Sequence, residues 1–282
     1  MTSRHLGWLS PERFGRAHVG RLTAPPLDGA TLPGHVRLPA PAAVYDQATV
    51  GRCVAESLAY GVETLAPRAG YAPERPDRTA LYYRCRRAIG SVGEDSGAIL
   101  ADGIEVLRGG WERELREPSP VFDASYTTPA PQRAAGLPRL VSAEPLAHDL
   151  ASVMWELACG HPVVVGLRVT GQWDALSHGA GDRLGAPEGD VTGGHAVCLV
   201  GYQTSPAGTE FRVRNSWGAS WGDRGEAWLH ASWLSIGSCG ELHALRAIRR
   251  VEAPRDDRPD LFPPKGSDPE TRPDFTPKGD LR

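Results

Sequence analysis

The sequence predicts an α+β protein in which the helices come first and the strands follow. From Cys53 onward, apolar residues recur every four positions at Val54, Leu58 and Val62, a spacing typical of an amphipathic helix. Beyond residue 160, short apolar runs such as 163–169 are typical of strands. Helices followed by strands favour a fold with the two types segregated over an alternating α/β arrangement.

Further elements are expected on the same grounds. Residues 97–107 and 145–158 carry apolar residues at helical spacing, and Gly160 suits the C-terminal cap of the second of these helices. Apolar runs predict strands at residues 163–169, 196–202, 211–214 and 226–230. The stretch 177–194 holds six glycines and is expected to be a surface loop, or else a lid over the active site.

Composition excludes several classes of function. The 282 residues include 31 Lys+Arg and 34 Asp+Glu, so no excess of positive charge predicts a nucleic-acid or acidic membrane partner. No run of about 18 apolar residues predicts a membrane span, and the N-terminus lacks the apolar core of a secretory signal. The histidines and cysteines lack metal-ligand spacing, and no phosphate-binding glycine motif follows a strand. We therefore expect no metal and no cofactor.

The five cysteines are few and scattered: Cys53, Cys85, Cys159, Cys198 and Cys239. An odd number without close pairs argues against a disulfide framework. This usage predicts a reducing compartment, most simply the cytoplasm.

Four residues form a set with a chemical meaning. Gln47 precedes Cys53 by six residues, His195 follows Gly193-Gly194, and Asn215 opens the run Asn-Ser-Trp-Gly. A Cys followed about 130–150 residues later by a His and then an Asn is the order found in papain-type enzymes. The set resembles the papain family of cysteine peptidases over residues 32–250. The resemblance implies a two-lobed fold, with a helical lobe at about 53–158, a β-barrel-like lobe at about 160–250 and a cleft between them.

The resemblance also implies roles for these residues. Cys53 would be the nucleophile, its thiolate favoured by a helix N-terminus and by protonated His195. His195 would then protonate the leaving group, and Asn215 would orient its imidazole. Gln47 and the backbone N–H of Cys53 would stabilise the oxyanion. Trp217 would shield the His–Asn hydrogen bond from water.

Substrate contacts are expected at Gly97, Gly194, Trp217 and Ala244. Gly97 stands where relatives carry a Gly-Gly pair that binds substrate main chain, and Gly194 replaces their usual Asp before the catalytic His. Ala244 would floor the second specificity subsite and favour an apolar side chain. Val54 replaces the aromatic residue that usually follows the nucleophile. These departures leave the triad intact and bear on substrate preference.

Both ends of the chain differ from the body. Residues 1–31 form an N-terminal extension that is short for the inhibitory propeptides of secreted relatives, so we expect no zymogen of that kind; no sequence feature shows whether they cover the cleft. Residues 251–282 are rich in proline and charge and are expected to be disordered. Two similar motifs, at 258–266 and 272–279, predict either a solvated tail or a doubled docking site for a protein partner.

The sequence therefore predicts a cytoplasmic cysteine peptidase that acts on a peptide or protein substrate through an acyl-thioester intermediate. Two alternatives remain open at this point. The same thioester is able to react with an amine, which would make the protein an acyl transferase or an amide-forming enzyme. A protein that had kept the fold without the chemistry would be a peptide-binding scaffold.

Overall fold

The computed structural model describes residues 6–16, 18, 23, 31–39, 41–72, 75–128, 137–178 and 181–250. The proline-rich segment at 251–282, with its two motifs, lies outside these residues. Among the described helices, none is both long and apolar enough to cross a membrane.

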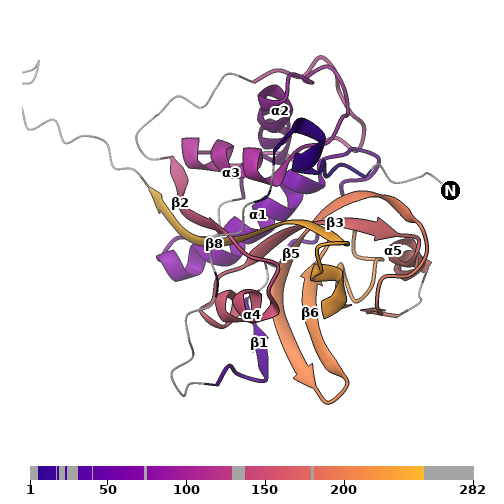
Figure 1. Cartoon of the computed structure of the whole chain (residues 1–282). Helices are drawn as coiled ribbons and strands as arrows, with labels where there is room; N and C mark the ends of the chain where they lie inside the picture. Colours follow the sequence, from indigo (N-terminus) through magenta and orange to yellow (C-terminus); the bar gives the residue numbers. More distant parts are fainter. Residues whose placement is uncertain are drawn as a thin grey trace, which may run out of the picture.

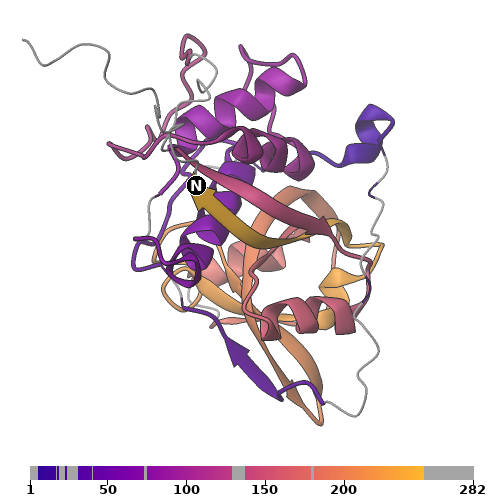
Figure 2. The same ribbon diagram turned by 90° about the vertical axis from the view of Figure 1, so that its left-hand side faces the viewer.

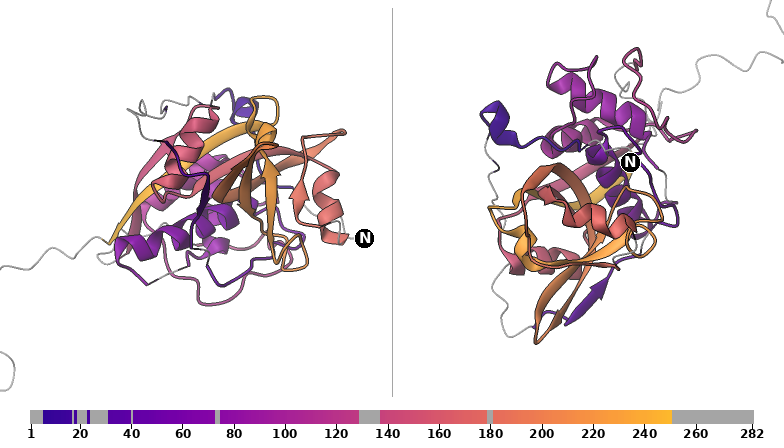
Figure 3. Two further views of the ribbon diagram at one scale, coloured as in Figure 1. Left: turned by 90° about the horizontal axis from the view of Figure 1, so that it is seen from below. Right: turned by 90° about the vertical axis from the view of Figure 1, so that its right-hand side faces the viewer.

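Within the described residues, eight strands form one sheet, and Figure 1 shows how it curves. They are β1 (His35–Arg37), β2 (Pro138–Pro145), β3 (Val163–Thr170), β4 (Arg183–Leu184), β5 (Val191–Ser205), β6 (Gly208–Arg214), β7 (Glu226–His230) and β8 (Cys239–Arg250). Their order is β2-β8-β3-β5-β6-β7-β4, and β1 pairs with β5. The pairs are antiparallel except for β4 with β7. In the right-hand view of Figure 3 the strands curl into a partly open ring.

The part of the chain that the structure describes also contains five α-helices: α1 (Cys53–Leu65), α2 (Arg78–Ala88), α3 (Leu100–Gly109), α4 (Leu150–Ala158) and α5 (Gln172–Ala175). Short 3-10 turns occur at Pro11–Phe14, Ala66–Ala69, Leu176–His178 and Ala231–Leu234. Helices α1, α2 and α3 contact one another, and α1 also packs on β5 and β8. Figure 2 shows α2 and α3 together on one side of the molecule, with α1 between them and the strands.

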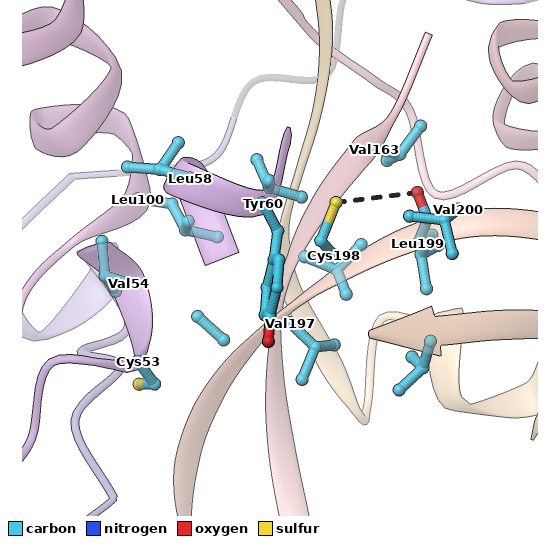
Figure 4. Packing of buried hydrophobic residues seen from close by; sticks show 14 of the residues in the cluster. Cys53, Val54, Leu58, Tyr60, Leu100, Val163, Val197, Cys198, Leu199 and Val200 are labelled. Atoms are coloured by element: carbon cyan, nitrogen blue, oxygen red, sulfur yellow. Dashed lines mark hydrogen bonds between the residues drawn. The ribbon is translucent and has the colours of Figure 1, made fainter. Parts of the chain in front are cut away.

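Helix α1 is the centre of the core, since every one of its residues is buried. Val54 and Leu58 pack toward the helical side, and Val197 and Cys198 of β5 lie across from the helix in Figure 4. A helix buried on all sides needs partners for its charged residues. Glu56 has them, because it pairs with Arg52 at 2.6 Å and with Arg78 at 2.7 Å.

The predicted α+β class is confirmed, and β7 has the predicted bounds. Helix α2 and strands β2 and β8 were not predicted, because their many charged residues mask the apolar pattern. The stretch 177–194 is not one loop, since it contains β4 and the start of β5.

Candidate active site

Cys53 is the first residue of α1, where the backbone N–H groups have no partner within the helix. The loop before it returns to the β side of the molecule. Gln47 N–H donates to Ser216 O at 2.9 Å, and Val50 N–H donates to Gln47 O at 3.0 Å. These bonds fix the path of the chain from Gln47 to Cys53 beside the residues that follow β6.

His195 and Asn215 are hydrogen bonded. His195 lies within β5, Asn215 directly follows β6, and His195 Nε2 is 2.7 Å from Asn215 Oδ1. The same Oδ1 accepts the Ser216 N–H at 2.8 Å, so the amide presents its oxygen and His195 Nε2 carries a proton. Acid–base chemistry at neutral imidazole therefore falls to Nδ1.

Aromatic rings enclose this hydrogen bond. The Trp217 ring centroid is 4.8 Å from that of His195, and Trp173 meets the same imidazole edge-on at 5.7 Å. Trp221 and Trp233 extend the cluster around Trp173. His195 and Asn215 are buried, with 0% and 1% of their surface exposed, so little water competes for their hydrogen bond.

Gln47 joins the same group of residues. Its Oε1 accepts from the Ser216 hydroxyl at 2.6 Å, and its Nε2 donates to Val50 O at 3.0 Å. The side chain is fully buried and held from both sides of the active site. Gln47 is thus fixed in orientation next to Asn215-Ser216.

The thiol of Cys53 meets β5 directly after the histidine, because the backbone of Ala196 hydrogen bonds to it. Burial raises the pKa of the Cys53 thiol to about 12, and backbone hydrogen bonds from Ala196, Gly7 and Val54 oppose this rise. The negative charge of Glu56 raises the pKa further. Burial thus disfavours the thiolate in this arrangement.

The N-terminal part of the chain covers Cys53. We call residues Leu6–Ser10 the inserted segment. Trp8 N–H donates to Gly194 O at 3.0 Å, Ala98 N–H donates to Gly7 O at 2.7 Å, and Leu9 N–H donates to Ala98 O at 2.8 Å. The segment is thereby held between Ala98 and β5. Part of the N-terminal extension thus covers Cys53, a point that the sequence left open.

The Trp8 side chain is buried, with 4% of its surface exposed. Its Nε1 donates to Glu241 Oε2 at 2.8 Å. A Cβ atom added at Gly166 or Gly240 would lie 2.3 or 2.6 Å from the indole, and one at Gly194 would lie 2.2 Å from Trp8 O. We call Gly166, Gly194, Gly240 and Glu241 the Trp8 site.

Known cysteine proteases resemble this chain in sequence and in fold. Residues 137–243 match the sequence model described as papain family cysteine protease. The crystal structure of xylellain, a cysteine protease from Xylella fastidiosa, has a TM-score of 0.66 and 25% identity, covering 88% of this chain and 100% of that one. The chain is thus similar to papain-family cysteine proteases, in sequence over residues 137–243 and in fold. Bromelain from Ananas comosus, solved with the inhibitor E64, shares the fold at a TM-score of 0.56, 18% identity, 79% of this chain and 100% of that chain.

Two curated proteins are also similar to this chain. An uncharacterized peptidase C1-like protein of Acanthamoeba polyphaga mimivirus is 27% identical over 67% of this chain and 65% of its own length. Cathepsin B-like CP3 of Giardia intestinalis is 35% identical over 27% of this chain and 25% of its own length. The chain thus spans less than two thirds of either relative.

Of the predicted substrate-binding residues, Gly97 and Gly194 lie against the inserted segment, whereas Ala244 is buried within the sheet. Gly97 has a φ of +85°, and a Cβ there would lie 2.3 Å from Gly7 O. The main-chain hydrogen bonds to the inserted segment come from its neighbour Ala98, and Gly194 supplies a carbonyl. Ala244 is fully buried on β8, where it pairs with Val163 and Glu144.

Sequence reasoning did not single out Trp8, Trp173 or Glu241. Trp8 lies in a polar stretch with no periodicity, and its role depends on how the chain folds back. Glu241 directly follows Cys239-Gly240. An alignment with the papain family at that pair would therefore have pointed to it. Among the described residues, no three His, Cys, Asp or Glu side chains gather to hold a metal ion.

A cavity of about 570 Å³ has Arg52, the residue before Cys53, in its wall. It is lined in part by Tyr82, Arg86, Phe122 and Tyr126. Arg86 stacks on the rings of Tyr82 and Phe122 at 4.4 and 4.6 Å, so its guanidinium already has partners within the protein.

Proposed function

We propose that this protein hydrolyses peptide bonds, with Cys53 as the nucleophile and His195 as the general acid and base. The hydrogen bond of 2.7 Å between His195 Nε2 and Asn215 Oδ1 carries the proposal. It fixes the tautomer that leaves Nδ1 for proton transfer, next to the Ala196 backbone that contacts the Cys53 thiol.

The reaction follows from these positions. His195 Nδ1 takes the thiol proton, and the sulfur attacks the amide carbonyl carbon. The oxyanion is stabilised by the Gln47 side chain and by the backbone N–H of Cys53 at the start of α1. His195 then protonates the leaving amine, which leaves a thioester on Cys53. Water that has lost a proton to His195 hydrolyses the thioester and restores the thiol.

The raised pKa of the covered thiol means that the reaction requires the inserted segment to leave. When water and substrate reach Cys53, the desolvation that disfavours the thiolate is relieved, and the helix N-terminus and imidazolium favour it. A cytoplasmic setting fits the five cysteines, none of which forms a disulfide.

The test uses the full-length chain with Trp8→Ala, which removes the side chain that anchors the inserted segment. We expect this variant to cleave fluorescently labelled casein faster than the unmodified chain, and to be alkylated at Cys53 by iodoacetamide, as read by intact mass. The matched control carries Trp8→Ala together with Cys53→Ala. Equal cleavage by the control would falsify the assignment of the nucleophile.

One added reagent separates hydrolysis from acyl transfer. Hydrolysis predicts cleavage products with free carboxylates when glycinamide is present, because water reaches the thioester. Products that carry glycinamide in place of the carboxylate, found by mass spectrometry at the expense of hydrolysis, would make the protein an acyl transferase instead.

A further inference from the structure

The Trp8 site is lined by glycines, which present backbone atoms to the indole ring. Gly166, Gly194 and Gly240 lie on three strands, and any side chain larger than hydrogen at these positions would collide with Trp8. The three glycines therefore leave room for a flat ring system the size of an indole. The space is a property of strands β3, β5 and β8, which belong to the sheet and not to the inserted segment.

One end of this space is a buried carboxylate. Glu241 is 1% exposed; its Oε2 accepts the Leu100 N–H at 3.1 Å, and its Oε1 accepts the Ala101 N–H at 3.1 Å. His243 Nε2 lies 3.3 Å from Oε1. Both oxygens are thus held by the start of α3, where the helix N-terminus favours a negative charge.

The carboxylate leaves an acceptor position that the occupant must satisfy. Trp8 Nε1 fills it at 2.8 Å from Oε2. A buried carboxylate oxygen that loses a donor is costly, because an ionised group out of water needs its hydrogen bonds. An occupant of the same shape without an N–H group would therefore fit the walls and still bind more weakly.

Resting on the proposed peptidase function, we propose that the Trp8 site is the specificity subsite for substrate and that Glu241 makes it select tryptophan. The inserted segment places the site beside Cys53, since the Gly7 backbone contributes a hydrogen bond toward the thiol and the neighbouring residue, Trp8, fills the site. The selected side chain is that of the substrate residue that precedes the one whose carbonyl is attacked. Because Trp8 instead follows Gly7, a substrate would take the place of Trp8 with its chain running in the opposite direction to the inserted segment.

This proposal differs from the expectation based on Ala244, which favoured a purely apolar side chain. Leucine and phenylalanine bury apolar surface in the site but offer Glu241 no donor. Tryptophan combines a flat apolar body with a single N–H at its edge, which matches three glycines and one carboxylate. Glu241 is therefore a specificity-determining residue.

The test uses an isosteric pair of substrates. Full-length Trp8→Ala protein is given the peptides acetyl-Ala-Xaa-Ala-aminocoumarin, with Xaa as tryptophan, 3-benzothienylalanine, phenylalanine or leucine. Benzothienylalanine keeps the bicyclic shape and replaces the N–H by sulfur. We expect kcat/KM to be about 10-fold or more higher for tryptophan than for benzothienylalanine, the size of a lost hydrogen bond to a charged group.

Variants assign the effect to one carboxylate. Glu241→Leu in the Trp8→Ala background leaves no acceptor for the indole N–H and should reduce the tryptophan-to-benzothienylalanine ratio toward one. Glu144→Leu, on the neighbouring strand β2 and outside the Trp8 site, should leave the ratio unchanged. Equal rates for tryptophan and benzothienylalanine in the Trp8→Ala protein, or a preference for leucine, would overturn the proposal even if the variants folded poorly.

Binding separates this proposal from the proposed function. Fluorescein-labelled versions of the four peptides are titrated into full-length protein with Trp8→Ala and Cys53→Ala, and anisotropy is measured. Tighter binding of the tryptophan peptide would support the Trp8 site even if no peptide were cleaved, in which case only the catalytic proposal fails. Equal binding of all four peptides, with cleavage intact, would overturn only the tryptophan preference.

Discussion

Cys53 and His195 belong to one candidate active site but are held by different interactions. Cys53 begins a helix whose first turn is tied by charge, through the buried Glu56 and its partners Arg52 and Arg78. His195 is held by one amide and by the rings of Trp173 and Trp217. The orientation of the imidazole is thus built into the sheet, whereas the charge state of the thiol depends on what covers it.

The largest effect should come from the imidazole. In the Trp8→Ala background, His195→Ala is expected to lower kcat/KM for peptide cleavage on the order of 10⁴-fold, because both proton transfers are lost. The exposed His35 on β1 provides the control, and His35→Ala should leave the rate unchanged. Substantial cleavage by the His195 variant would place the general base elsewhere.

The ion pairs of Glu56 with Arg52 and Arg78 should contribute to the free energy of unfolding. Glu56→Ala leaves buried Arg52 and Arg78 short of a carboxylate and is expected to lower the free energy of unfolding by about 3 kcal/mol. Glu105→Ala removes a solvent-exposed pair with Arg108 on α3 and should cost less than about 0.5 kcal/mol. Urea denaturation measures both. Similar losses for the two variants would mean that the buried network contributes no more than a surface pair.

A smaller effect is expected from the amide. Asn215→Ala should reduce kcat/KM by about 10- to 100-fold, less than His195→Ala, because Trp173 and Trp217 still confine the imidazole. The pH–rate profile is the second readout, since Asn215 orients the group that titrates. If Asn215→Ala lost as much activity as His195→Ala, the aromatic rings would not hold the imidazole on their own.

The smallest effect concerns the N-terminal extension and pH. His18 lies against His148 and His243, with ring centroids 5.5 and 5.2 Å away, and its Nε2 is 2.8 Å from Leu146 O. Burial lowers the His18 pKa below 6.5, the neighbouring histidines lower it further, and Leu146 O and Glu241 oppose this.

A released His18 regains its ordinary pKa, so release takes up a proton. Docking of the extension should weaken as pH falls below 6.5 and remain unchanged above it. Hydrogen exchange of residues 6–16, corrected for intrinsic rates, measures this. His18→Gln should show less weakening on acidification, and an unchanged pH response in that variant would mean that His18 does not cause it.

The sequence predicted which residues lie together at the candidate active site better than it predicted their surroundings. His195, Asn215 and Trp217 lie in short local motifs, and the strands that carry them are apolar enough to recognise. The Trp8 site could not be predicted in the same way, because its glycines come from three separate strands and its occupant from the N-terminus. Helix α2 escaped notice because arginines whose charges are paired in the fold look like surface residues in the sequence.

Gly7 offers a way to uncover the active site without touching it. A Cβ atom at this position would lie 1.8 Å from Gly51 O, a backbone atom that has no freedom to move aside cheaply. The methyl group of Gly7→Ala would collide with Gly51 and should displace the inserted segment. The substitution leaves Trp8, Glu241 and the candidate catalytic residues unchanged. The inserted segment can cover Cys53 only because residue 7 has a hydrogen atom where other residues have a Cβ. Gly7→Ala should therefore give a form of the protein in which Cys53 stays uncovered.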